Sequence, residues 1–187
     1  MSTTTPEFTP ADGLLAQLNE LQISFSGAVA HIRLNRPAKR NAINEALMQQ
    51  LHTALIHLPA SVQALVISGE GQHFCAGLDL SDLSERTVAE GIAHSRGWHA
   101  VMDALQYYRV PVVAALHGAV VGGGLELAAA THVRVADATT YFGLPSQQRA
   151  FGNRVLVQIK ADNLGGILLH RVADFYRLDV GHGLDGL

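Results

Sequence analysis

The stretch HGAVVGGGLELAAA, residues 117–130, places three consecutive glycines before a short apolar run that holds one acid, Glu126. Glycine is costly in regular structure, so the run indicates that some group approaches the backbone closely. Residues 111–118 are nearly all apolar, which is typical of a buried strand, and a helix is expected from about Gly124. The order strand, glycines, helix can direct backbone N–H groups and a positive helix end towards an anion.

Three kinds of group could approach the backbone closely at these glycines: a phosphate, an oxyanion or a packed strand. The spacing is not G-x-G-x-x-G and no G-K-[ST] follows, so neither the dinucleotide fingerprint nor the P-loop is present. Asp137 lies too near to be the strand-end acid that dinucleotide binding requires. For the glycine run alone, close strand–helix packing and anion binding both stay open.

A second loop, HFCAGLDL at residues 73–80, favours the oxyanion. It also follows a predicted strand, and Gly77 precedes a residue whose N–H can point inward. Two N–H groups from two such loops are what an oxyanion hole for a thioester enolate requires. Glu126 lies about one helical turn from Gly123, so both can face one pocket. An acid that only stabilises the helix dipole is the alternative, but the apolar neighbours of Glu126 predict a half-buried carboxylate suited to acid–base work.

Strands alternate with helices along the chain, which predicts an α/β fold with a mainly parallel sheet. Residues 1–12 are expected to be a flexible tail, residues 13–145 a core, and residues 146–187 an atypical C-terminal segment. The predicted strands are 28–35, 62–69, 111–118 and 132–137, and the predicted helices are 44–58, 85–108 and the one after the glycines. Asn44 is the expected N-cap of the first helix, which Pro59 ends. The second helix has an apolar series at Val88, Ile92, Val101, Met102 and Leu105.

Composition bounds the class of protein. The chain has 187 residues and a formal net charge of −3, which gives no reason to expect a nucleic-acid or anionic-membrane partner. The basic cluster at 36–40 is too short to suggest nucleic-acid binding, and no apolar run is long enough to span a membrane. The polar N-terminus has no signal- or transit-peptide pattern, so the expected location is cytoplasmic.

The single cysteine and the histidines suggest no disulfide and no metal. Cys75 excludes an internal disulfide framework and is expected to pack rather than to act as a nucleophile. The pairs His52/His57 and His94/His99 are five residues apart, so on a helix they splay and no metal site is predicted.

Three motifs occur in order: IRLNRPAKRNAIN at 32–44, HFCAGLDLSDL at 73–83 and HGAVVGGGLELAAATHVRVADATTYFGLP at 117–145. Together they resemble the crotonase, or enoyl-CoA hydratase/isomerase, family from about residue 21 to 145. The resemblance implies a crotonase-like spiral of β-β-α turns, with a truncated or diverged C-terminal helical region. It also implies an enzyme that stabilises the enolate of an acyl-CoA thioester, most often by hydrating a 2-enoyl-CoA to a 3-hydroxyacyl-CoA. Double-bond isomerisation comes next, and an inactive acyl-CoA-binding or subunit-interaction protein is the alternative outside the enzymes.

The same resemblance assigns roles to residues. The N–H groups of Leu78 and Gly123 would form the oxyanion hole, and Glu126 would be the general base or acid. Lys39 and Arg40 would meet the CoA phosphates. CoA would enter as part of the substrate, with no separate cofactor, and the family suggests a trimer-based homo-oligomer. The remaining substrate-binding residues implied by the resemblance are Ala76, Gly77, Asp79, Leu80, Ser81 and Gly122.

The chain departs from the family pattern after Pro145. Ser146 stands where family hydratases have a second glutamate, and a serine cannot serve as a carboxylate acid or base. Relatives with other reactions keep the hole and move the acid. Residues 146–187 show neither the expected glycine-rich turn nor a helical pattern. Divergence, truncation and a shifted reading frame would each produce such a segment.

Overall fold

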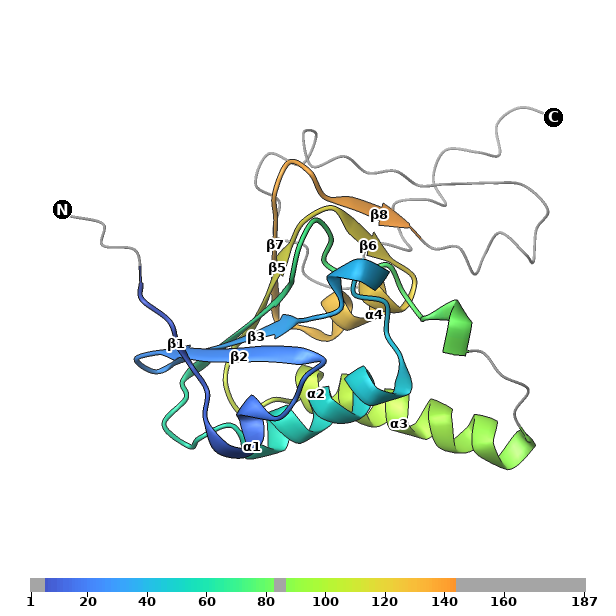
Figure 1. The fold of residues 1–187 in the computed structure, drawn as a ribbon, viewed down its shortest axis with the longest axis horizontal. Coiled ribbons are helices and arrows are strands. Elements are labelled where there is room, and N and C mark those ends of the chain that lie inside the picture. Colours follow the sequence, from blue (N-terminus) through green and yellow to red (C-terminus); the bar gives the residue numbers. More distant parts are fainter. Residues whose placement is uncertain (1–5, 83–86, 144–187) are drawn as a thin grey trace, which may run out of the picture.

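The computed structural model describes residues 6–82 and 87–143 of the chain. They form a six-stranded sheet in the order β1-β2-β3-β4-β5-β7 and a two-stranded sheet, β6-β8. Helices α1, α2 and α3 lie along one side of the larger sheet (Figure 1). The elements are β1 (Thr9–Pro10), α1 (Gly13–Ala16), β2 (Leu21–Ser26), β3 (Val29–Leu34), α2 (Glu45–His57), β4 (Ala64–Gly69), α3 (Val88–Gln106), β5 (Val112–Leu116), β6 (Ala119–Val121), α4 (Gly123–Ala130), β7 (Val133–Ala136) and β8 (Tyr141–Gly143), with short 3-10 helices at Pro37–Lys39 and Leu80–Asp82.

The larger sheet is parallel from β3 to β7, as the alternation of strands and helices predicts. Strands β3, β4, β5 and β7 pair in parallel, whereas β1, β2 and β3 pair antiparallel. Alternate residues face the core, and Ile32, Ile67 and Ala114 on three neighbouring strands are fully buried. Because parallel strands end at the same edge, the loops after β4 and β5 begin side by side.

Helix α2 forms where the sequence predicts it. The Asn44 side chain accepts a 2.8 Å hydrogen bond from the backbone N–H of Leu47 and so caps the first turn. Leu47, Leu51 and Leu55 recur at helical spacing and are buried against the sheet. The helix ends just before Pro59.

Helix α3 packs only along its second half. Val101 and Leu105 are buried, but Val88 and Ile92 are 82% and 49% exposed, so only the later part of the predicted apolar series packs in the core. The cause is geometric: the first half extends beyond the end of α2 (Figure 1). A capping box between Thr87 and Glu90 stabilises this end instead.

Two further expectations need correction. β5 was expected to be buried on both faces, but only Val112, Ala114 and Leu116 are buried, because the described helices cover just one face of the sheet. The tail expected over residues 1–12 is partly ordered: Thr9–Pro10 pair with β2, and the Ala11 N–H donates to the Ile23 carbonyl at 2.8 Å. The expected C-terminal segment, 146–187, lies outside the described residues.

Arg134 fixes the C-terminal end of α4. Its guanidinium is buried and donates from Nη1 to the carbonyls of Ala128 and Ala129, at 3.3 and 3.2 Å, and to that of Thr131. A cation at this end complements the helix dipole and occupies carbonyls that have no helical partner. Burial lowers the pKa of Arg134. This end of α4 is therefore anchored, and the opposite end carries the glycines.

Candidate active site

The loop after β4 runs alongside β6. The N–H of Phe74 donates to the His117 carbonyl at 2.8 Å, and that of Cys75 to the Ala119 carbonyl at 2.9 Å. The Cys75 carbonyl in turn accepts from the N–H of Val121 at 3.0 Å. Through these bonds, the parallel pairing of β4 with β5 continues between the loop after β4 and the segment after β5. The loop that holds Gly77 is thereby brought against the glycine run.

The N–H of Leu78 is turned towards the glycine run. On the other side of the loop, Ile43 donates to the Gly77 carbonyl at 2.7 Å and accepts from the N–H of Asp79 at 2.8 Å. In this parallel bridge the residues flanking Leu78 make the bonds, so its own N–H points away from Ile43. Gly77 has a φ of +99°, and a Cβ there would lie 2.9 Å from the Val121 carbonyl oxygen and 3.6 Å from the Gly123 nitrogen. Only glycine fits this approach.

Gly122 turns the chain from β6 into α4. Its φ is +52°, and its N–H donates to the Gly143 carbonyl on β8 at 2.8 Å. Its carbonyl accepts from Leu125 and Glu126 at 2.9 and 3.1 Å, which starts the helix and leaves the first N–H, that of Gly123, outside the helical pattern. Within residues 6–82 and 87–143, neither the Gly123 nor the Leu78 N–H has an acceptor. Two backbone donors without an acceptor among the described residues thus lie on two loops that pack against each other.

The other two glycines of the run have different neighbours. A Cβ on Gly124 would lie 2.5 Å from the carbonyl oxygen and 2.9 Å from Sγ of Cys75, whereas one on Gly123 would stand 3.5 Å from both Leu78 and Trp98. Close packing therefore explains Gly124, while at Gly123 an added Cβ would make only ordinary van der Waals contacts. Cys75 is fully buried, as the packing prediction expects, and burial raises its pKa to about 12.

Glu126 lies on the exposed side of α4, so the prediction of a half-buried carboxylate is wrong. The buried side of this eight-residue helix carries Leu127 and Ala128 instead. The Glu126 carboxylate accepts a 2.9 Å hydrogen bond at Oε2 from the indole Nε1 of Trp98 on α3. Sequence reasoning missed Trp98, because no local pattern relates a residue of α3 to the first turn of α4.

Four of the residues expected to contact CoA lie near one another. The Arg40 carbonyl accepts from the N–H of Ala76 at 3.0 Å, and Lys39 Nζ lies 3.4 Å from Ser81 Oγ. These contacts join the 3-10 turn at Pro37–Lys39 to the loop after β4. Leu80 is 75% exposed at the surface of that loop.

Asp79 is turned inward rather than towards this surface. Its Oδ1 accepts from the N–H and the hydroxyl of Ser81, at 3.1 and 2.6 Å, and its Oδ2 pairs with Arg36 at 2.9 Å. The Ser81 hydroxyl and then the Arg36 guanidinium lower the Asp79 pKa to about 2, despite burial. The Arg36 guanidinium also donates to the Ala42 carbonyl. Asp79 thus holds the loop in shape, and Arg36 is a structural partner that sequence reasoning did not single out.

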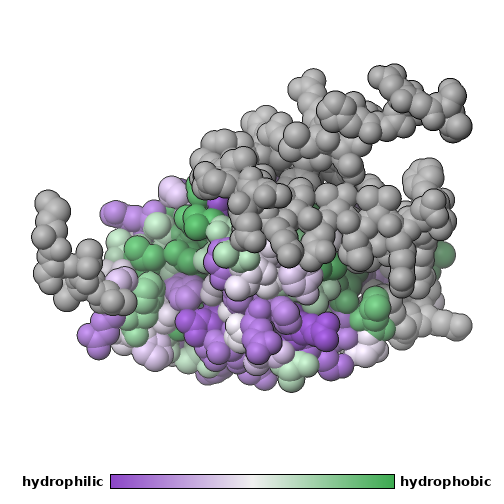
Figure 2. Space-filling model, turned by 90° about the horizontal axis from the view of Figure 1, so that it is seen from above, coloured by the Kyte–Doolittle hydropathy of each residue, from purple (hydrophilic) through white to green (hydrophobic). Residues whose placement is uncertain are grey.

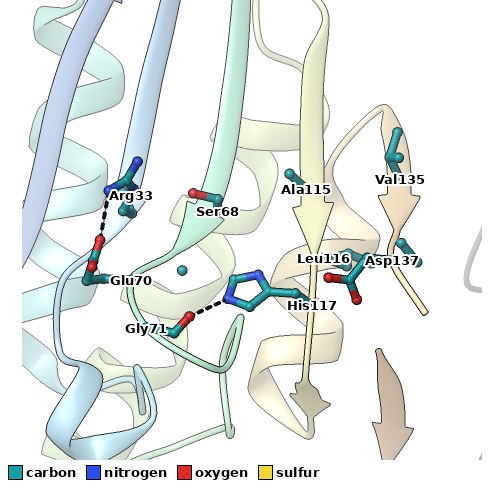
Figure 3. A pocket seen from close by; sticks show the side chains of 11 residues that line it. Arg33, Ser68, Glu70, Gly71, Ala115, Leu116, His117, Val135 and Asp137 are labelled. Atoms are coloured by element: carbon teal, nitrogen blue, oxygen red, sulfur yellow. Dashed lines mark hydrogen bonds and ion pairs between the residues drawn. The ribbon is translucent and has the colours of Figure 1, made fainter. Parts of the chain in front are cut away.

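A separate open hollow of about 550 Å³ lies on the outer face of the sheet. It is lined by Arg33, Glu70, His117 and Asp137 together with small residues of β4, β5 and β7 (Figure 3). Arg33 pairs with Glu70 at 2.8 Å, and His117 Nε2 is 3.1 Å from the Gly71 carbonyl, so these polar groups already have partners. The hollow lies apart from the glycine run, and we assign it no ligand.

The described residues hold no group of three or more His, Cys, Asp or Glu side chains placed to bind a metal ion. Within the same ranges, no helix combines the length and apolar character needed to cross a membrane. Hydrophobic side chains do reach the visible surface, in groups among hydrophilic ones (Figure 2).

Comparison with known proteins gives one family. Residues 24–175 match the model of the family described as enoyl-CoA hydratase/isomerase, a match that continues past Ser146. The chain is 37% identical over 130 residues to the 2,3-dehydroadipyl-CoA hydratase of Escherichia coli K12, which covers 68% of this chain and 50% of that protein. It is 31% identical over 141 residues to the peroxisomal Delta(3,5)-Delta(2,4)-dienoyl-CoA isomerase of Arabidopsis thaliana, covering 68% and 51%. The chain thus spans about half the length of these curated relatives.

Solved structures agree with the family match. A chain from Rhodopseudomonas palustris CGA009, provisionally assigned as an enoyl-CoA hydratase, aligns with a TM-score of 0.69 and 53% identity over 72% of this chain and 52% of that one. An enoyl-CoA hydratase from Bacillus anthracis aligns with a TM-score of 0.66 and 26% identity, covering 71% and 53%. The crotonase-like α/β fold predicted from the sequence is confirmed.

Proposed function

Because the chain belongs to the enoyl-CoA hydratase/isomerase family, we propose that it binds an acyl-CoA thioester and stabilises the enolate formed from it. One observation supports the proposal: a Cβ on Gly123 would stand 3.5 Å from the Leu78 side chain, and neither residue's N–H has an acceptor within the described residues. Donors arranged in advance around a developing oxyanion stabilise the transition state, each by about 10²- to 10³-fold in rate. The thioester oxygen would sit between them.

The surrounding residues would bind the rest of the substrate. We assign the CoA phosphates to Lys39 and Arg40, and the adenine to residues 78–81. Gly122 and Gly123 would border the thioester itself. The contact between Lys39 and Ser81, at 3.4 Å, supports this assignment because it keeps the basic turn beside the loop. CoA enters as part of the substrate, and the proposed steps use no further cofactor.

Hydration of a 2-enoyl-CoA is the reaction we propose first, in line with the hydratase among the relatives. Glu126 would take a proton from water as the water oxygen bonds to C3 of the enoyl group. The electron pair of the double bond would move onto the thioester oxygen, giving the enolate held by Leu78 and Gly123. Return of the proton from Glu126 to C2 would complete the 3-hydroxyacyl-CoA. Because Ser146 cannot act as a carboxylate, one acid carries both transfers in this scheme.

Isomerisation is the second candidate. Moving a double bond needs one base that takes a proton from one carbon and returns it to another, which a single carboxylate can do. The dienoyl-CoA isomerase among the relatives supports this alternative. A third possibility, thioester binding without turnover, follows from the atypical residues after Pro145.

The test uses the full chain with crotonyl-CoA and, separately, a 3-enoyl-CoA, with products analysed by mass spectrometry. Hydration adds the mass of one water, whereas isomerisation leaves the mass unchanged and changes only retention. Binding without turnover, unchanged by Glu126→Gln, would support the inactive protein. A chain that neither binds nor converts either thioester would contradict the proposal.

We also propose a homo-oligomer, in line with the family, and sedimentation equilibrium tests it. Exposed apolar side chains such as Val88 and Tyr107, at 82% and 77%, are consistent with a partner surface. A stable, soluble monomer at micromolar concentration would contradict the proposal. The cytoplasmic location stays a prediction.

A further inference from the structure

We infer that Trp98 is a positioning residue that holds the Glu126 carboxylate beside Gly123; the inference rests on the proposed function. The indole Nε1 of Trp98 donates to Oε2 of Glu126 at 2.9 Å. The far edge of the same ring, at Cη2, lies 3.5 Å from the position of a Cβ on Gly123. One rigid side chain therefore binds the acid and lies next to Gly123 of the proposed hole.

Glu126 needs such a contact because its own helix does not restrain it. The side chain is exposed, and a glutamate in water samples several rotamers. An indole N–H can donate but not accept, so it occupies one carboxylate oxygen and leaves Oε1 for proton transfer. Holding a catalytic group in the reactive geometry accounts for a large part of enzymatic rate, and small misplacements cost about 100-fold.

Contacts between α3 and α2 next to Trp98 fix the position of this part of α3. His94, four residues earlier, lies with Nδ1 2.9 Å from Oε2 of Glu45 on α2. At the neighbouring Gly97, an added Cβ would stand 3.4 Å from the terminal methyl of Met48, so α3 lies close to α2 at this point. The position of the indole thus depends on helix packing rather than on its bond to Glu126.

A double-mutant cycle tests the role. Trp98→Phe keeps an aromatic ring at this position of α3 and removes the indole N–H donor. We expect it to lower kcat by about 10- to 100-fold, with KM within about threefold. In the Glu126→Gln background, the same substitution should change kcat by less than about twofold. Asp103→Asn, an exposed carboxylate on α3, is the matched control and should leave kcat unchanged.

If Trp98→Phe lowered kcat by the same factor in the wild-type and Glu126→Gln backgrounds, the proposed role of Trp98 would be overturned, because the ring would then act without Glu126. An unchanged kcat for Trp98→Phe would do the same. A wild-type chain that neither binds nor converts the thioester would instead overturn the proposed function.

A spectroscopic measurement does not depend on a folded Trp98 variant. Trp98 is the only tryptophan of the chain, so its emission reports one site. We expect Glu126→Gln to shift the emission of the full chain, because a charged acceptor at Nε1 is replaced by a neutral group. Asp103→Asn should not shift it. Superimposable spectra of wild type and Glu126→Gln would contradict the hydrogen bond on which the inference stands.

Discussion

Cys75 packs directly against Gly124, leaving no room for a side chain at the second position of α4. A Cβ at Gly124 would lie 2.7 Å from the Cβ and 2.9 Å from the Sγ of Cys75, both fully buried. The neighbouring Gly123 has no such obstruction, since a Cβ there would meet Leu78 and Trp98 at an ordinary 3.5 Å. Gly124 is therefore required by the packing of the fold, whereas we assign Gly123 to the proposed site.

Gly124→Ala should lower the free energy of unfolding by about 1–3 kcal/mol, because the methyl group must displace buried backbone. Urea titration followed by circular dichroism measures the change. Gly91→Ala is the matched control: it lies exposed in α3 with open space around it, and should raise stability by up to about 1 kcal/mol. Equal midpoints for Gly124→Ala and wild type would contradict the packing argument.

Gly123→Ala, unlike Gly124→Ala, should lower activity and leave stability nearly unchanged. The φ angle of Gly123 lies outside the left-handed region, so alanine fits this backbone conformation. The free energy of unfolding should therefore change by less than about 1 kcal/mol. The methyl group would contact the side chains of Leu78 and Trp98, next to the proposed hole. We expect kcat/KM to fall at least about tenfold. Full activity in this variant would place the hole elsewhere.

Glu126→Gln should lower kcat by about 10²- to 10⁴-fold, because the amide cannot transfer a proton. Binding of the CoA ester should change little, since the phosphates and thioester contact other residues in the proposed scheme. Steady-state kinetics with a parallel binding titration measure both quantities, and Asp103→Asn serves as control. Unchanged kcat would remove Glu126 from the reaction.

Asp79 should make stability depend on acid pH. The Ser81 hydroxyl and the Arg36 guanidinium lower the Asp79 pKa in the folded chain from 3.8 to about 2, so folding favours the ionised form. The stabilisation is complete above the unfolded pKa and is lost as pH falls through the folded one, and a shift of nearly two pKa units corresponds to roughly 2–3 kcal/mol.

Asp79→Asn should therefore be less stable than wild type near neutral pH, by about 2 kcal/mol, and this difference should shrink as pH falls from about 4 to about 2. Urea unfolding across this range measures it. A constant difference at every pH would mean that the variant loses stability through geometry and not through charge. Asp103→Asn should show no comparable trend.

Local patterns predicted the elements well where one face of a segment packs fully. The N-cap at Asn44 and the buried series Leu47, Leu51 and Leu55 of α2 follow directly from spacing. The same reasoning overestimated the burial of apolar side chains in the first half of α3. Periodicity shows which face of a helix is apolar but not whether another element covers that face. Short strands such as β6 and β8 were missed, since three residues carry too little periodicity.

The sequence by itself determined the order of the longer helices and the parallel strands, the two loops that meet, and the family. These follow from periodicity, turn residues and motif spacing, which act between near neighbours in the chain. Only the tertiary structure decided which glycine faces Cys75, that Asp79 turns inward to Arg36, and that Trp98 reaches Glu126. The last two contacts join residues 43 and 28 positions apart, and such contacts depend on how helices and loops pack, a three-dimensional balance that no local pattern encodes.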